Sequence, residues 1–165
     1  MSISHGTFKQ VLAQWASGVT VVTSRDEHGP EGLTVSSFSS VSLDPPLVLV
    51  SVHLGSDTLR AIEASQAFAV NVLAAGQVDL GRRFAGLLPG VVDRFDGLVT
   101  TPGVTGSPVL PDALAVLECR VWRMVEAGDH RVIIGEVTHA AARDGEPLLY
   151  HARQWRTLAD VGVER

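Results

Sequence analysis

The stretch Leu33-Thr-Val-Ser-Ser-Phe-Ser-Ser-Val-Ser42 decides the fold of this 165-residue chain. It predicts a strand, in which alternation places the even-numbered hydroxyl residues on one side and Val35 and Ser37 on the other. Hydroxyl groups on a strand can simply face water. Beside a core strand, however, they need hydrogen-bond partners, and the polar edge of a planar ligand would provide them. Both interpretations stay open.

Strand-forming segments flank this stretch on both sides. Val19–Ser24 is rich in β-branched residues and predicts a preceding strand, and Asp26–Gly32 predicts the hairpin turn between the two because it holds two glycines and a proline. Asp44–Pro46 interrupts the run, since proline has no N–H for a sheet ladder. Leu47–Val52 then predicts a third, fully apolar strand.

Helices are predicted at three places. Phe8–Trp15 carries apolar residues at i, i+3, i+4 and i+7, and Gly18 is placed to end that helix. Ser56 is a natural N-cap for a short helix through Ala64, and Val78–Phe84 predicts a third helix.

Strands dominate the remainder of the chain. Phe68–Leu73, Leu114–Val125 and Arg131–Ala141 predict strands, with the last two joined by a hairpin, whereas Ala85–Pro111 predicts a loop and Leu148–Leu158 a short final element. Strands outnumber helices and most turns are short. This pattern favours a mainly β fold, an antiparallel barrel with helices at its ends, over alternating βαβ units.

The composition argues against several classes of function. A formal net charge of −5 does not suit nucleic-acid binding, which needs a basic surface. No apolar run approaches the ~20 residues of a membrane span, and the first residues lack a signal-peptide profile, so we expect a cytoplasmic protein with no membrane partner. An apolar content of 45% favours a subunit interface and hence an oligomer.

Common catalytic and metal-binding motifs are missing from the sequence. It has no dinucleotide-binding or P-loop glycine motif, no Gly-x-Ser-x-Gly elbow, and no His-Glu-x-x-His among its six histidines. These absences argue against a Rossmann site, a serine hydrolase and a zinc enzyme. The single cysteine, Cys119, lies in an apolar run and is interpreted as a buried core residue rather than a reactive thiol.

Four polar features each have two interpretations. Ser56-Asp-Thr58 at a helix start either caps the helix or cradles a phosphate. His130, in the turn Gly128-Asp-His130, is either an exposed turn residue or a group aimed into a pocket. Asn71 is either satisfied in the core or lines a site. Arg83 is either solvated or a phosphate ligand.

Taken together, these segments resemble the flavin reductase family with the FMN-binding split-barrel fold, whose members are typically the reductase halves of two-component flavin monooxygenases. The likeness covers about residues 8–158 and rests on the order and spacing of its motifs. These motifs are Gly18-Val-Thr-Val-Val-Thr23, Leu33–Ser42, Asp44-Pro-Pro-Leu47, Ser56-x-Thr58, Phe68-Ala-Val-Asn-Val-Leu73, Gly106-Ser-Pro108 and Gly128-Asp-His130.

The resemblance implies an antiparallel split β-barrel capped by short helices, formed by a single domain over residues 1–165. It implies FMN or FAD as the flavin, NADH or NADPH as co-substrate, a homodimer, and no metal site. His130 is implied as the catalytic residue, placed where nicotinamide stacks on the flavin. The flavin-binding residues implied are Thr34, Val35, Ser36, Ser37, Ser40, Val41, Ser42, Ser51, Ser56, Thr58, Asn71, Arg83, Phe84, Tyr150 and Trp155.

The function expected from the resemblance is that of an NAD(P)H:flavin oxidoreductase. Such an enzyme passes a hydride from a nicotinamide to FMN or FAD and releases reduced flavin to a separate monooxygenase. The cofactors carry the chemistry. The protein stacks the two rings and stabilises negative charge on the flavin, for which the backbone N–H groups beside Ser36 and Ser37 are candidates. Two alternatives stay open: an enzyme that keeps its flavin and reduces another small molecule, and a flavin-binding module without hydride transfer.

Overall fold

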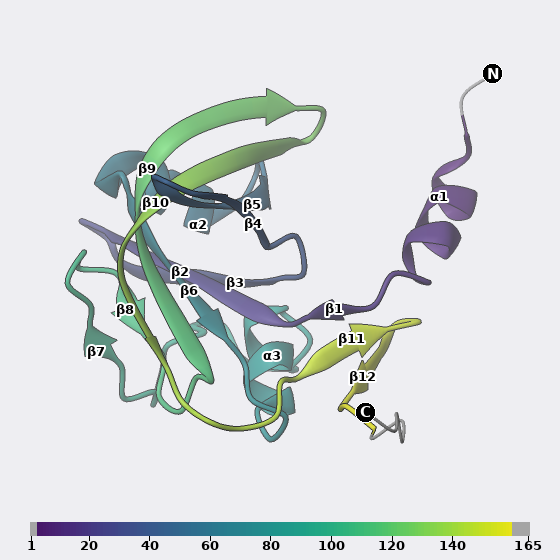
Figure 1. Cartoon of the computed structure of the whole chain (residues 1–165). Coiled ribbons are helices and arrows are strands. Elements are labelled where there is room, and N and C mark those ends of the chain that lie inside the picture. The colour runs from purple at the N-terminus through teal and green to yellow at the C-terminus, as the bar shows by residue number, and fades with distance from the viewer. Residues whose placement is uncertain (1–2, 160–165) are drawn as a thin grey trace.

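The computed structural model describes residues 3–159, which form a strongly curved antiparallel sheet with short helices around it (Figure 1). The helices of this part are α1 (His5–Leu12), α2 (Asp57–Ser65) and α3 (Val78–Phe84). The strands are β1 (Ser17–Gly18), β2 (Thr20–Asp26), β3 (Gly29–Val35), β4 (Ser39–Leu43), β5 (Pro46–His53), β6 (Ala67–Val72), β7 (Thr101–Pro102), β8 (Pro108–Val109), β9 (Ala115–Ala127), β10 (His130–Ala142), β11 (Leu149–His151) and β12 (Gln154–Arg156).

The main sheet has seven strands in the order β3-β2-β6-β9-β10-β5-β4. Consecutive strands β3 and β4 thus lie at opposite ends of the sheet, although only residues 36–38 join them. Flat, seven strands would hold their outer members about 29 Å apart at about 4.8 Å per strand. Three linking residues span at most about 14 Å. The sheet must therefore curl back on itself, and the predicted split β-barrel of mainly β class is confirmed.

Ser37 joins the two ends of the curled sheet. Its hydroxyl donates to the carbonyl oxygen of Ser51 and accepts from the N–H of the same residue, each at 3.0 Å. The ladder between β4 and β5 begins two residues later, where Ser39 pairs with Leu49. The Ser37 side chain therefore supplies the rung that the backbone of β4 does not reach. This turn also breaks the stretch at 36–38, so the prediction of one continuous strand over Leu33–Ser42 was wrong.

Two turns differ from the sequence expectation in extent. The predicted turn Asp26–Gly32 shrinks to Glu27 and His28, because the ladder of β2 and β3 runs down to the pair Asp26 and Gly29. The helix predicted over Phe8–Trp15 ends at Leu12, because the following residues lead directly into β1, which pairs with β11. Gly18 accordingly lies in β1 and does not end the helix.

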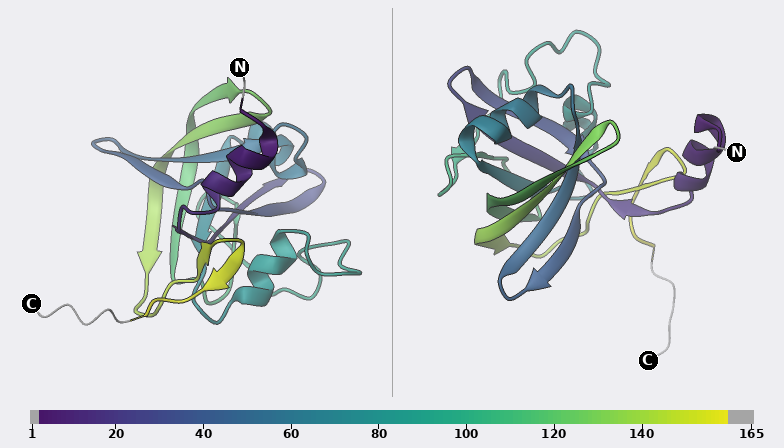
Figure 2. Two further views of the ribbon diagram at one scale, coloured as in Figure 1. Left: turned by 90° about the vertical axis from the view of Figure 1, so that its right-hand side faces the viewer. Right: turned by 90° about the horizontal axis from the view of Figure 1, so that it is seen from above.

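Helix α1 projects away from the barrel (Figures 1 and 2). None of its residues is buried, and its apolar residues Phe8, Val11 and Leu12 are each at least half exposed. Trp15, just beyond the helix, is 76% exposed. The apolar periodicity therefore marks a face that this chain leaves uncovered.

No helix of residues 3–159 is long and apolar enough to cross a membrane.

Two clusters of buried residues stabilise the barrel. One lies between the sheet and α2 and includes Val50, Phe68 and Ile133. The other lies against α3 and includes Leu73 and Phe84. Cys119 belongs to the first cluster, and burial raises the pKa of its thiol to about 12, as expected of a core residue.

We predict that Ser37→Ala destabilises the protein, because the N–H and carbonyl of Ser51 lose their partner while remaining half-buried. The expected loss is about 1–2 kcal/mol in the free energy of unfolding, measured by urea denaturation without ligand. Ser36→Ala is the matched control, because the neighbouring Ser36 side chain is exposed and forms no hydrogen bond with the described residues. Equal stability of the two variants would contradict the role given to Ser37.

Candidate functional site

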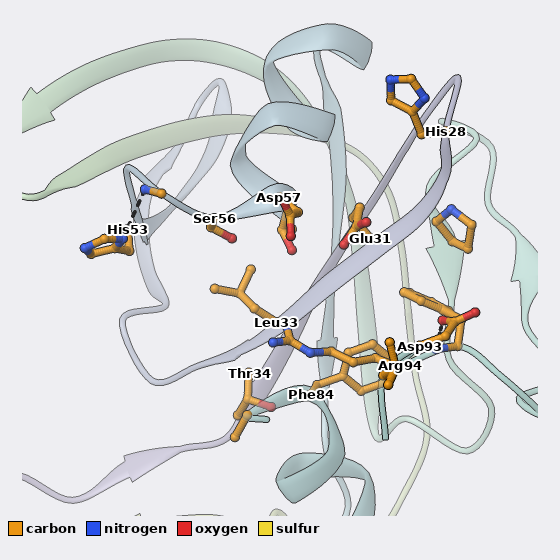
Figure 3. A pocket seen from close by; sticks show the side chains of 16 residues that line it. His28, Glu31, Leu33, Thr34, His53, Ser56, Asp57, Phe84, Asp93 and Arg94 are labelled. Carbon is orange, nitrogen blue, oxygen red and sulfur yellow. Dashed lines mark hydrogen bonds between the residues drawn. The ribbon is translucent and has the colours of Figure 1, made fainter. Parts of the chain in front are cut away.

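A cavity of about 630 Å³ opens between the β2–β3 hairpin, the start of α2 and the segment that follows α3 (Figure 3). Leu33 and Phe84 form its apolar floor beside Thr34, and charged and polar side chains enter from the other sides (Figure 3). Three separate parts of the chain therefore meet at one pocket, which places several of the predicted site residues together.

The start of α2 forms one wall and presents groups that suit an anion. Ser56 is the N-cap, but its side chain makes no capping hydrogen bond, so its hydroxyl remains available. The first N–H groups of a helix have no acceptor within the helix. Thr58 is buried and lines the same cavity. This combination supports the phosphate-cradle interpretation of Ser56-Asp-Thr58.

Arg94 supplies the cation that faces this wall (Figure 3). Its guanidinium Nη1 donates to the carbonyl oxygen of Gly32 at 2.8 Å, which holds the side chain across the cavity. Sequence reasoning missed Arg94, because it lies in an irregular loop whose path no periodicity reveals. The cavity also contains carboxylates, of which Asp57 pairs with Arg60. Burial, followed by the charge of Asp57, raises the pKa of Glu31 above its ordinary value.

Arg83 has two interpretations from the sequence, a solvated residue or a phosphate ligand, and the resemblance places it in the flavin pocket. In the structure its guanidinium is engaged by the backbone of a nearby loop. Its guanidinium donates to the carbonyl oxygens of Asp93, at 3.5 Å, and Asp96. It does not line the large cavity. Arg83 therefore attaches α3 to the loop that carries Arg94, and the structure gives the pocket-facing position to Arg94.

The hydroxyl-rich stretch forms the second wall and leads into an adjoining cavity of about 180 Å³. Thr34 borders both cavities, and its hydroxyl donates to the carbonyl oxygen of Gly81 at 2.7 Å. The N–H groups of Ser36 and Ser37 donate to no acceptor among residues 3–159, as the predicted charge-stabilising role requires. The lining of the smaller cavity includes the predicted residues Val35, Ser36, Tyr150 and Trp155.

The two aromatic residues at the chain's C-terminal side are held against each other. The rings of Tyr150 and Trp155 meet edge to face at 5.2 Å between centroids. Trp155 also packs on Gly81, where an added Cβ would lie 3.0 Å from its ring. The final hairpin therefore closes one side of the smaller cavity.

Several predicted residues lie outside both cavities. Ser40, Val41 and Ser42 lie on β4, with Val41 exposed at an irregularity in the ladder. The backbone N–H and carbonyl of Ser51 are hydrogen-bonded to the Ser37 hydroxyl, and Ser51 lines neither cavity. A flavin role for these residues stays a prediction.

The Asn71 side chain is hydrogen-bonded within the core, which is the first of its two interpretations. Its amide nitrogen donates to the carbonyl of Val21 at 3.1 Å and to the Thr23 hydroxyl at 3.2 Å, and its oxygen accepts from the N–H of Leu110 at 2.9 Å. Its side chain is fully buried and lines neither cavity. The structure therefore satisfies Asn71 within the fold, and a flavin contact for it also stays a prediction.

His130 lies beside the pocket rather than in its wall. It begins β10 opposite His53, the last residue of β5, and the two rings meet edge to face at 5.5 Å. His130 Nδ1 lies 2.7 Å from Asp129 Oδ1, and this hydrogen bond is the main reason why the pKa of Asp129 is lowered. His53 lines the pocket itself, and sequence reasoning missed it because a single histidine at a strand end carries no pattern.

The arrangement suits a phosphorylated ligand with a planar part. The phosphate would lie between the start of α2 and Arg94, and the planar part would follow the wall from Thr34 to Ser36. Within residues 3–159 no group of three or more histidine, cysteine or acidic side chains gathers to hold a metal ion.

Comparisons with known proteins match most of the chain. The family profile described as "Flavin reductase like domain" matches residues 12–159. The chain is 44% identical to the FMN reductase (NADH) SmoA of Agrobacterium fabrum over 144 residues, which are 87% of this chain and 80% of that protein. It is 38% identical to the flavin-dependent monooxygenase reductase subunit HsaB of Mycobacterium tuberculosis over 152 residues, 90% of this chain and 80% of that protein.

Solved structures also share this fold. The NADH:FAD oxidoreductase SgcE6 of Streptomyces globisporus C-1027, in complex with NAD and FAD fragments, matches with a TM-score of 0.88 and 36% identity. The match covers 97% of this chain and 96% of that structure. Sequence and structure therefore point to the same family.

Proposed function

The chain belongs to the flavin reductase family, and on that premise we propose that it transfers a hydride from NADH to FMN or FAD and supplies reduced flavin to a separate monooxygenase. The observation that carries the proposal is the pocket in which the uncapped start of α2 faces Arg94 beside the hydroxyl-rich wall. The relatives are named for NADH and for FMN or FAD, and the pocket contains groups for the phosphate that both flavins share.

Different residues bind the phosphate and the ring of the flavin. Ser56, Thr58 and Arg94 hold the flavin phosphate, and Phe84 supports the floor beneath it. The free N–H groups of Ser36 and Ser37 stabilise negative charge on the flavin ring. When bound, the flavin supplies the chemistry, because its ring accepts the hydride.

His130 is proposed to orient the nicotinamide. An ionised carboxylate can only accept a hydrogen bond, so the 2.7 Å contact with Asp129 places the proton of neutral His130 on Nδ1. The other ring nitrogen, Nε2, is then an acceptor that can receive the nicotinamide amide. The ring is held in one tautomer and does not need to act as an acid.

A second copy of the chain is proposed to cover α1. This helix exposes its apolar residues to solvent, and a groove of about 500 Å³ beside it is lined by Leu12, Trp15, Ser36 and Tyr150. Contact there would join the uncovered apolar face to the wall proposed for the flavin. The apolar composition fits such a homodimer.

We predict that Arg94→Met weakens FMN binding about ten-fold or more, because the phosphate loses its cation, while the affinity for riboflavin, which has no phosphate, stays the same. Fluorescence titration of both flavins measures the difference. Arg82→Met is the matched control, since Arg82 is an exposed arginine that lines neither cavity. An equal loss for FMN and riboflavin would show that Arg94 does not contact the phosphate.

We predict that His130→Ala lowers NADH oxidation about ten-fold or more and leaves flavin affinity within about two-fold, because His130 faces the nicotinamide and not the flavin phosphate. Steady-state kinetics with FMN and with FAD test this, and wild-type turnover with released flavin tests the proposed function itself. Unchanged turnover of the variant would remove His130 from the reaction.

We predict that the wild-type protein has the mass of a dimer and that Leu12→Arg combined with Trp15→Arg produces monomers, because two charges would enter the apolar interface. Light scattering after size-exclusion chromatography measures the mass. Val104→Arg, at an exposed valine in a distant loop, is the control and should remain dimeric. A monomeric wild type would refute the homodimer.

A further inference from the structure

The ring of His53 organises the turn that leads into α2. The ring Nδ1 accepts a hydrogen bond from the N–H of Gly55 at 3.0 Å (Figure 3). The backbone carbonyl oxygen of His53 accepts from the N–H of Ser56 at 3.0 Å. Because Nδ1 accepts, the proton of the neutral ring lies on Nε2. The His53 ring therefore holds Gly55, the residue that directly precedes Ser56 at the start of α2.

The same ring also contacts the nicotinamide side of the site. The register of β5 and β10 pairs His53 with His130, and their rings meet at 89° with 5.5 Å between centroids. The N–H of Leu54 donates to the carbonyl oxygen of Asp129 at 3.0 Å, which fastens the two turns together. Asp129 sets the tautomer of His130, whereas the His53 ring limits how the His130 ring can rotate.

We propose that His53 is a positioning residue that couples the two halves of the site, holding the start of α2 through its Nδ1 and the orientation of His130 through its ring. The proposal rests on the proposed function. His53 is exposed and belongs to neither buried cluster, so its contacts serve the site rather than the core.

Two substitutions separate the two contacts. His53→Asn keeps an acceptor that reaches the N–H two residues on, as in an Asx turn, but removes the ring. His53→Phe keeps a ring of similar shape for the edge-to-face contact but removes the acceptor. His139→Asn and His139→Phe are the matched controls, because His139 is exposed on β10 away from the site.

The two variants should lose different functions. For His53→Asn we expect the NADH KM to rise about two- to ten-fold, with FMN affinity within about two-fold of wild type. For His53→Phe we expect FMN affinity to fall about three- to ten-fold, riboflavin affinity to stay unchanged, and the NADH KM to stay within about two-fold. In a His130→Ala background, His53→Asn should raise the NADH KM no further, because its effect passes through His130.

The remaining outcomes decide against the proposal. Equal losses of NADH and FMN binding in both variants, together with lower thermal stability, would show a merely structural role. An additive effect in the His130→Ala background would show that His53 does not act through His130. An active wild type with unaffected His53 variants would overturn this inference alone, whereas a wild type that reduces no flavin with NADH would overturn the proposed function as well.

Discussion

The two hydrogen bonds between the Ser37 hydroxyl and the backbone of Ser51 hold the ends of the curled sheet together, and the site depends on them. Residues 36–38 must turn sharply from β3 towards β5, so their N–H groups are left without strand partners. Those N–H groups are the donors that we propose for the flavin ring. The constraint that closes the barrel thus also creates one wall of the pocket.

The closure also determines where the other wall lies. Ser51 stands two residues before His53 on β5, and the chain turns from His53 into α2. Pairing of β5 with β10 then brings His130 opposite His53. Strand β5 therefore contains Ser51, which is bonded to Ser37 where the barrel closes, and His53, which pairs with His130. The chain leaves β5 directly towards α2, the proposed phosphate-binding helix. This arrangement brings residues distant in sequence, such as Ser37 and His130, against the same strand.

The sequence predicted the elements better than their connections. β-branched runs such as Val19–Ser24 and Phe68–Leu73 became strands because local preference and burial agree there. The break at 36–38 could not be predicted, since it arises from closure of the sheet and leaves no mark on the alternation. The same reason explains the arginines: the family resemblance pointed to Arg83, but only the folded loop shows that Arg83 binds loop carbonyls while Arg94 faces the pocket.

The charges around the pocket oppose one another. The start of α2 and Arg94 attract a phosphate, whereas Glu31 and Asp57 repel it, and burial together with Asp57 already raises the pKa of Glu31. A bound anion would favour the protonated form of Glu31 still more. Binding of the anion is therefore weakened by the free energy needed to protonate that carboxyl. The two carboxylates therefore lower the affinity of the pocket for a phosphate to the same extent in oxidised and reduced flavin.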